Sequence, residues 1–234
     1  MALSQAVPQW VVAGFTSLDP WNFMGFNPRT KRFVVNMDVA TEPEGMGGTE
    51  GYDGWDFGIS PTLGHHQQTD PEILELAYPV RLLQHENVMD KAGAGKFRGG
   101  NGSTCVYQAL APLDAVQWGA GQLEHAVPPG LLGGKPSVPH EVRKRTLDGE
   151  LEKIEPHSFF TLKPGEMYIR HQAGGPGFGD PFERDPERVR KDVRNEFVSI
   201  ESAKRDYGVV IDPVTLEVDY EETRALRGKR GERQ

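Results

Sequence analysis

Cysteine is nearly absent from this sequence. Cys105 is its single cysteine among 234 residues. One cysteine can form no internal disulfide, and it excludes a zinc site built from several cysteines. Because Cys105 lies in the β-prone stretch Ser103-Thr-Cys-Val-Tyr107, we expect a small buried strand residue. A reactive thiol next to the preceding glycine-rich run is the alternative.

Signals for export and for membrane insertion are also lacking. No lysine or arginine precedes Arg29, so the amino terminus has no basic region of a signal peptide. No apolar stretch approaches the roughly 20 residues of a membrane span. The formal net charge of −8 disfavours nucleic acid and anionic membranes as partners. We therefore expect a cytoplasmic protein that binds neither.

The familiar nucleotide and hydrolase motifs are missing as well. A Walker loop needs glycine six positions before its lysine and Ser or Thr after it, but Asp90 and Phe97 flank Lys96 at those places. A dinucleotide fingerprint starting at Gly93 would need a third glycine where Arg98 stands. No Gly-x-Ser-x-Gly elbow occurs and no Cys-His pair can be proposed. The residues alone show no complete catalytic set.

Glycine and proline are abundant instead, at 28 and 18 residues. This composition indicates many turns and short strands, so we predict an α+β fold that is β-rich, with long Gly/Pro loops and short carboxyl-terminal helices. Strands are expected at 32–39, 103–110 and 115–118, and over 141–171 with turns at Asp148-Gly149 and Pro164-Gly165. Residues 72–83 fit a short helix or a strand interrupted at Pro79.

The carboxyl-terminal fifth changes character. Asp185 can cap a helix that has Pro186 at its first position, and Ser199 can cap a second one that ends at Gly208. A small hairpin is expected to follow. We predict a β-rich core region over 1–183, a helical and hairpin segment over 184–223, and a disordered tail over 224–234.

Two glycine-rich runs, 92–104 and 173–181, are the main candidate site. Glycines cluster where backbone turns tightly or approaches something closely. The first run carries Lys96 and Arg98, and backbone amides beside fixed cations suit a phosphate or carboxylate. The predicted substrate- or phosphate-binding residues are therefore Lys96, Arg98, Gly93, Gly95, Gly99 and Gly100. The alternative is a set of bends in which both cations are solvated or paired with acidic side chains.

A second group of polar residues lies in the long loop 42–64 and just after it. Asp53, Asp56, His65 and His66 could bind a divalent metal or exchange protons. Adjacent histidines rarely bind one metal together, so the two histidines are candidates and no metal site is assigned. His125 is a candidate base, and His171 could play the same part; a structural role is the alternative for both.

Five segments carry a family resemblance. They are 72–79, 92–100, 128–134, 174–187 and 198–210. In this order they resemble the B subunit of the hydantoinase/oxoprolinase family, from about Trp21 to about Arg227. The similarity covers only the carboxyl-terminal part of such B subunits, which are longer. It implies part of a split B subunit or a truncated product.

The resemblance implies a subunit of an ATP-dependent hydantoinase/oxoprolinase-like complex, inactive alone, that hydrolyses a small cyclic amide after carbonyl activation. ATP with Mg would be bound mainly by an A-type partner, and a separate amino-terminal B-type subunit would be the second partner. Any divalent metal would lie elsewhere in the complex. An Asp-Gly pair matching Asp53-Gly54 recurs in the family, which makes Asp53 the preferred catalytic candidate. A subunit of an acetone or acetophenone carboxylase and a non-catalytic structural subunit are the alternatives.

Overall fold

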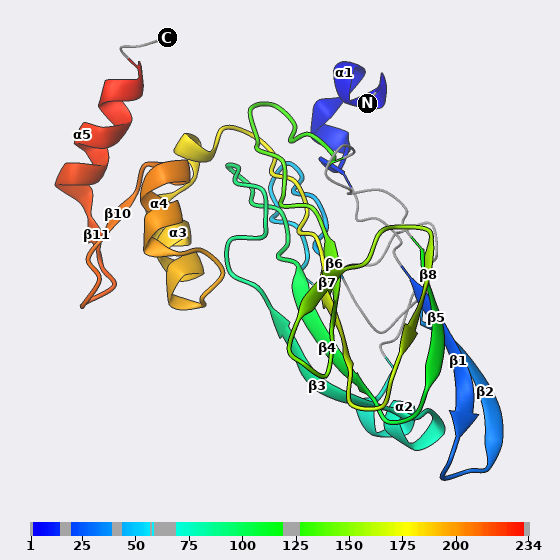
Figure 1. Ribbon diagram of the computed structural model, residues 1–234. Helices are drawn as coiled ribbons and strands as arrows, with labels where there is room; N and C mark the ends of the chain where they lie inside the picture. The colour runs from blue at the N-terminus through cyan, green and yellow to red at the C-terminus, as the bar shows by residue number, and fades with distance from the viewer. Residues whose placement is uncertain are drawn as a thin grey trace.

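Strands of two antiparallel sheets make up most of the regular structure in the computed structural model (Figure 1). The structure describes residues 2–14, 20–38, 44–56, 58, 69–118 and 127–231. Short helices gather toward the carboxyl terminus, so the fold is α+β and β-rich, as predicted. None of the helices within the described ranges combines the length and the apolar character that crossing a bilayer requires.

The first sheet has four strands in the order β2-β1-β5-β8. Their bounds are β1 Trp21–Asn27, β2 Arg32–Asp38, β5 Leu113–Gln117 and β8 Ser158–Leu162. The second sheet has the order β3-β4-β9-β6-β7. Its strands are β3 Val80–Asn87, β4 Ser103–Ala109, β6 Glu141–Arg145, β7 Leu151–Lys153 and β9 Met167–His171. Gly149 and Gly165 have φ values of 85° and 92°, which confirms the two turns predicted there.

The two sheets pack face to face around an aromatic core. Trp21 stacks on Tyr168 of the other sheet with ring centroids 4.1 Å apart. The Tyr168 hydroxyl donates to Gln117 Oε1 at 2.6 Å, so the polar end of this buried ring is satisfied. Cys105 is fully buried in the same core, as expected from the sequence. Long loops extend from one end of this sandwich (Figure 1).

The opposite face of the first sheet is apolar and exposed. Strand alternation and the β1–β2 register place Phe26 opposite Phe33 and Met24 opposite Val35 on this side. Its exposed members are Phe26, Phe33, Val35, Met37 and Phe159, at 52 to 85% exposure. We call these five residues the apolar face. Both faces of this sheet are therefore built to be covered, although the described residues cover only one.

The helices begin and end where their capping residues predict. In α2, Pro71–Ala77, Asp70 accepts from the amides of residues 72 and 73, and the chain turns into β3 after Pro79. Asp185 caps α3, Pro186–Arg194, and Ser199 caps α4, Ile200–Tyr207. Gly208 ends α4 with φ 61°. The remaining short elements are α1 Ala2–Ala6, η1 Pro8–Trp10, η3 Pro181–Glu183, β10 Val210–Ile211 and β11 Val218–Asp219.

The last helix, α5, spans Tyr220–Gly231, so residues 224–231 differ from the disordered tail that the composition predicts. Asp219 accepts from the amides of Glu221 and Glu222 and thereby caps the helix. Arg227 donates to the carbonyls of Tyr207 and Arg184. These contacts with the preceding segment supply the tertiary support that a short charged helix lacks by itself.

Candidate functional site

The glycine-rich runs pack against each other as backbone on backbone. A Cβ on Gly99 would lie 1.8 Å from the carbonyl oxygen of Gly175, and one on Gly100 would lie 2.0 Å from that of Trp55. At Gly93 and Gly95 the nearest backbone atoms would lie 2.2 and 2.6 Å from a Cβ. Since real Cβ atoms do not approach this closely, only glycine fits. The sequence predicted that the backbone of these glycines approaches something closely, and the structure shows that they approach backbone of other segments of the same chain.

Backbone amides of residues 96 to 101 in the first run are all engaged. Those of residues 96, 97, 99 and 100 donate to the carbonyls of residues 179, 178, 93 and 46. The amides of Arg98 and Asn101 donate to Asp53 and Asp56 at 2.8 and 2.7 Å. Six consecutive donors thus have partners within the chain, and a phosphate could bind them only by displacing those partners.

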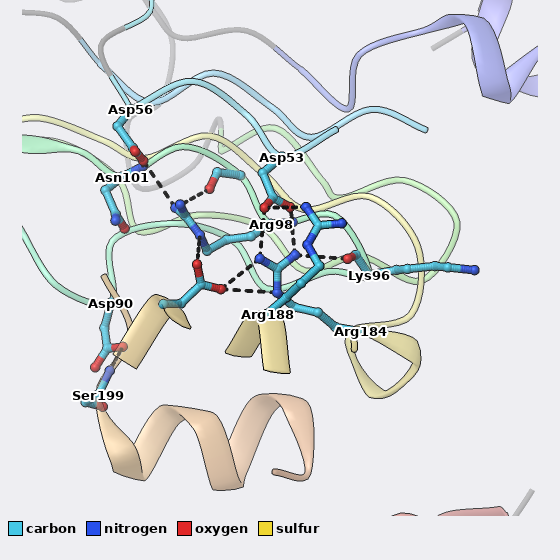
Figure 2. A network of polar contacts seen from close by, with 11 residues as sticks. Asp53, Asp56, Asp90, Lys96, Arg98, Asn101, Arg184, Arg188 and Ser199 are labelled. Carbon is cyan, nitrogen blue, oxygen red and sulfur yellow. Dashed lines mark hydrogen bonds and ion pairs between the residues drawn. The ribbon is translucent and has the colours of Figure 1, made fainter. Parts of the chain in front are cut away.

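Arg184 is the centre of a buried ion-pair network between these loops and α3 (Figure 2). It is 1% exposed. Its Nη1 and Nη2 donate to Asp53 Oδ1 and Oδ2 at 2.7 and 2.8 Å, and its Nη2 also donates to Asp192 Oδ2 at 2.8 Å. Arg188 adds a bond to Asp53 Oδ2 at 2.7 Å. Two-pronged Arg–carboxylate contacts fix both distance and orientation, so the network locks the loop that carries Asp53 onto α3.

Arg98 extends the same network and is also buried. Its Nη1 donates to the Gly99 carbonyl at 2.7 Å and to Asp56 Oδ1 at 3.2 Å. Its guanidinium carbon lies 5.0 Å from the ring centroid of Phe197, within range of a cation–π contact. Arg98 is therefore held by acidic and aromatic partners. This matches the alternative in which the cations of the first run pair with acidic side chains of the chain itself.

The charges of the network balance. Three arginines, at 98, 184 and 188, face three aspartates, at 53, 56 and 192. Burial alone would raise the pKa of Asp53, but the hydrogen bond from Arg184 and the surrounding arginine charges hold it below its ordinary value. For Asp192 burial dominates and its pKa is raised. A balanced network of this kind positions loops and leaves little attraction for a further anion.

Lys96 is placed differently from Arg98. Its Nζ lies 3.2 Å from Glu183 Oε2, and its side chain is 44% exposed. It can exchange this surface partner for an external anion at little cost. His65, His66 and His125, the remaining candidates for metal binding and base catalysis, lie outside the described residues. Within the described part, no three His, Cys, Asp or Glu side chains are grouped so as to hold a metal.

A pocket of about 630 Å³ beside β6 forms a second candidate site. Its charged lining residues are Lys91, Glu141, Lys153 and Glu155. Apolar side chains form much of the lining, which comprises Lys91, Gln117, Val138, Pro139, His140, Glu141, Val142, Lys153, Ile154, Glu155 and Pro156. A mainly apolar concavity with a few polar groups is typical of small-molecule sites.

Titratable groups lie together next to this pocket. Glu141 is the register partner of His171, and His171 is the partner of Thr104; His171 Nδ1 lies 2.8 Å from the Thr104 hydroxyl. Burial lowers the pKa of His171, and the charge of Lys91 lowers it further. Burial also lowers the pKa of Lys91. No local pattern in the sequence marks Lys91 or Glu141, because their proximity depends on the register of β6 and on the Val138–Lys91 backbone contact.

Two solved structures share this architecture. Acetone carboxylase in its nucleotide-free form matches with a TM-score of 0.81 at 23% identity, over 99% of this chain and 35% of that one; identity at this level shows the fold alone. The ATP-dependent caprolactamase of Pseudomonas jessenii matches with a TM-score of 0.79 at 30% identity, over 97% of this chain and 40% of that one. The fold is thus of a class found within larger enzyme chains.

Sequence comparison identifies the family. Caprolactamase subunit beta of Pseudomonas jessenii is 36% identical over 221 residues, which cover 91% of this chain and 37% of that subunit. The family model described as hydantoinase B/oxoprolinase matches residues 1–181. The chain belongs to the hydantoinase B/oxoprolinase family, which confirms the resemblance recognised in the sequence. It spans little more than a third of the length of the caprolactamase subunit.

Proposed function

We propose that this chain is part of the B component of an ATP-dependent enzyme that hydrolyses a cyclic amide, a lactam or a hydantoin. The observation that carries the proposal is the 36% identity to caprolactamase subunit beta across 91% of the chain. Hydrolysis of such a ring cleaves the C–N bond of the amide and adds water, which yields a carboxylate together with an amine from a lactam or a ureido group from a hydantoin. An amide carbonyl is a poor electrophile because of resonance, so a reaction coupled to ATP is chemically reasonable.

The apolar face supports assembly with further polypeptide. Phe33, Met37 and Phe159 are each at least 65% exposed, and contiguous exposed apolar surface marks an interaction site. The part that this chain matches is 37% of the caprolactamase subunit. We therefore assign the apolar face to contact with the remaining B-type portion. An A-type ATP-binding subunit would be the other partner, and this chain would be inactive alone.

The first glycine-rich run does not fit a nucleotide phosphate. The amides of residues 96 to 101 are already hydrogen bonded, and the charge of Arg98 is balanced by carboxylates. ATP and Mg are therefore assigned to the A-type partner, and no step is assigned to them here. Any divalent metal is likewise assigned to other parts of the complex, which would work in the cytoplasm, where ATP is available.

Within the proposed enzyme, this chain would position loops and contribute one exposed cation. Arg184 and Arg98 hold Asp53 and Asp56 in place, so we assign Asp53 a positioning role. Lys96 has an exposed side chain within the first glycine-rich run. It is the residue of the predicted Lys96–Arg98 pair that can reach an anionic intermediate held by a partner.

The test is reconstitution. The chain is co-expressed with an A-type subunit and an amino-terminal B-type polypeptide from the same host, and ATP hydrolysis by the complex is measured with a lactam, a hydantoin, or a ketone with bicarbonate. Stimulation by a cyclic amide with ring opening supports the proposal. Stimulation only by the ketone with bicarbonate contradicts it and identifies a carboxylase.

The second candidate function is that of a non-catalytic structural subunit. It is favoured because Asp53 and Arg98 are both held in ion pairs within the chain. The variant Phe33→Ser/Phe159→Ser alters the apolar face only and should reduce co-purification with the B-type polypeptide. The matched control is Lys96→Met, which should leave assembly intact. A Lys96→Met complex with full turnover favours the structural role.

A further inference from the structure

We propose that the pocket beside β6 binds a small organic carboxylate, with Lys91 as the group that recognises its charge. The inference deepens the proposed function, because it takes from that function the chemical class of the ligand. No residue of this pocket belongs to the ion-pair network around Arg184.

Lys91 forms no ion pair with a described residue, although the Glu141 carboxylate is near enough to act on its charge. Lys153 pairs with Glu155 at 3.2 Å, and Glu141 pairs with Arg143 at 2.6 Å. Among the described residues, no carboxylate oxygen lies within 4.0 Å of Lys91 Nζ. Half-buried cations normally have a partner, because removing a charge from water costs free energy. An anionic ligand would provide that partner.

The remaining lining determines what kind of anion fits. Val138, Val142 and Ile154 present apolar surface beside the lysine. Inorganic phosphate or sulfate would gain nothing from these side chains, whereas the hydrocarbon part of an organic acid would be removed from water. A volume of about 630 Å³ accommodates a molecule considerably larger than an inorganic ion.

Position and chemistry agree with such a ligand. Lys91 directly precedes the first glycine-rich run, and its carbonyl accepts from the amide of Val138 at 3.2 Å, so the pocket adjoins the packed loops. Opening a lactam or a hydantoin ring yields an organic carboxylate. The pocket therefore fits the acid end of the product, with Lys91 as the binding residue.

The experiment measures ligand binding to the purified chain by isothermal titration calorimetry. The probes are hexanoate, hexanamide, hexylammonium, bicarbonate and inorganic phosphate. Hexanoate should bind, and the neutral amide and the ammonium ion should bind at least about tenfold more weakly, because the charge-assisted contact is lost. Binding of bicarbonate or phosphate without binding of hexanoate overturns the proposal.

Three variants make the test specific to the site. Lys91→Met should weaken hexanoate binding by about tenfold or more, while Lys153→Met, at the same pocket but paired with Glu155, should change it less than threefold. Val138→Trp should abolish binding by filling the pocket without a change of charge. Thermal unfolding of each variant shows that it is folded. Equal affinity in Lys91→Met and the wild type overturns the assignment.

Failure of this inference is distinguishable from failure of the proposed function. Lys91-dependent binding of hexanoate to a chain whose complex opens no cyclic amide would retain the site and reject the function. A complex that opens a lactam equally well with Lys91→Met, and whose chain binds no hexanoate, would retain the function and reject the site.

Discussion

Arg184 and Asp53 lie 131 positions apart in the sequence and form a two-pronged ion pair, with N–O distances of 2.7 and 2.8 Å. Arg184 also binds Asp192 from α3. One side chain thereby joins the loop after β2 to the carboxyl-terminal helices. Its loss would leave two aspartates without their main partner.

Arg184→Met should therefore lower the free energy of unfolding strongly. Breaking a buried ion pair by removal of one partner costs about 3–5 kcal/mol. Arg188→Met is the matched control, because Arg188 contacts the same Asp53 oxygen but its side chain is 40% exposed; we expect about 1 kcal/mol or less. Urea unfolding of both variants measures the difference, and equal losses would contradict a central role for Arg184.

Asp53 should make stability depend on acid pH. Its pKa is lower in the folded chain than the ordinary value of 3.8, so the unfolded chain binds the proton more readily. The stabilisation is complete above pH 3.8 and is lost as the pH falls through the folded-state value. Asp53→Asn should lower stability at pH 7 and reduce the slope of unfolding free energy against pH below 3.8. An unchanged slope in the variant would refute this assignment.

Other carboxylates also have lowered pKa values, such as Glu141 and Asp206. They make the free energy of unfolding depend on acid pH in both the wild type and Asp53→Asn. The difference between the wild type and Asp53→Asn isolates the contribution of Asp53. Asp192 acts in the opposite sense, since its raised pKa makes the folded chain bind the proton more readily above pH 3.8.

Local signals predicted much of the fold. Asp185, Ser199 and Gly208 cap helices through contacts that span a few residues, and the turns at Gly149 and Gly165 depend on backbone conformation alone. Such features are encoded in short stretches of sequence. The predicted strands at 32–39 and 103–110 correspond to β2 and β4 for the same reason.

The candidate site could be predicted only in part. The glycine-rich runs were recognisable, but the partner that they approach is another part of the backbone, which no local pattern reveals. The contact between Arg184 and Asp53 and the proximity of Lys91 to Glu141 depend on tertiary packing and strand register. Sequence reasoning therefore identified Asp53, Lys96 and Arg98 as candidates but could not identify their contacts.

Gly99 and Gly228 offer a test of backbone packing. Gly99→Ala would place a Cβ 1.8 Å from the Gly175 carbonyl oxygen, and because backbone must move, we expect a loss of more than about 3 kcal/mol or a failure to fold. Gly228 lies in α5 with nothing within 4 Å of its Cβ position. Gly228→Ala should stabilise the chain by up to about 1 kcal/mol, as measured by thermal unfolding. A tolerated Gly99→Ala would contradict the packing explanation.

Substitution of Arg98 should lower the stability of the chain, whereas substitution of Lys96 should lower the turnover of the complex. Arg98 is buried among Asp56, Asp192 and Phe197, so Arg98→Met should lower the free energy of unfolding by about 3 kcal/mol or more. Lys96→Met removes only a surface ion pair and should change it by less than about 1 kcal/mol. Lys96→Met therefore isolates the proposed anion contact: turnover by the reconstituted complex should fall while stability and assembly do not. Lys96→Arg, which keeps the charge, should restore most of the turnover, and full activity of Lys96→Met would remove Lys96 from the proposed site.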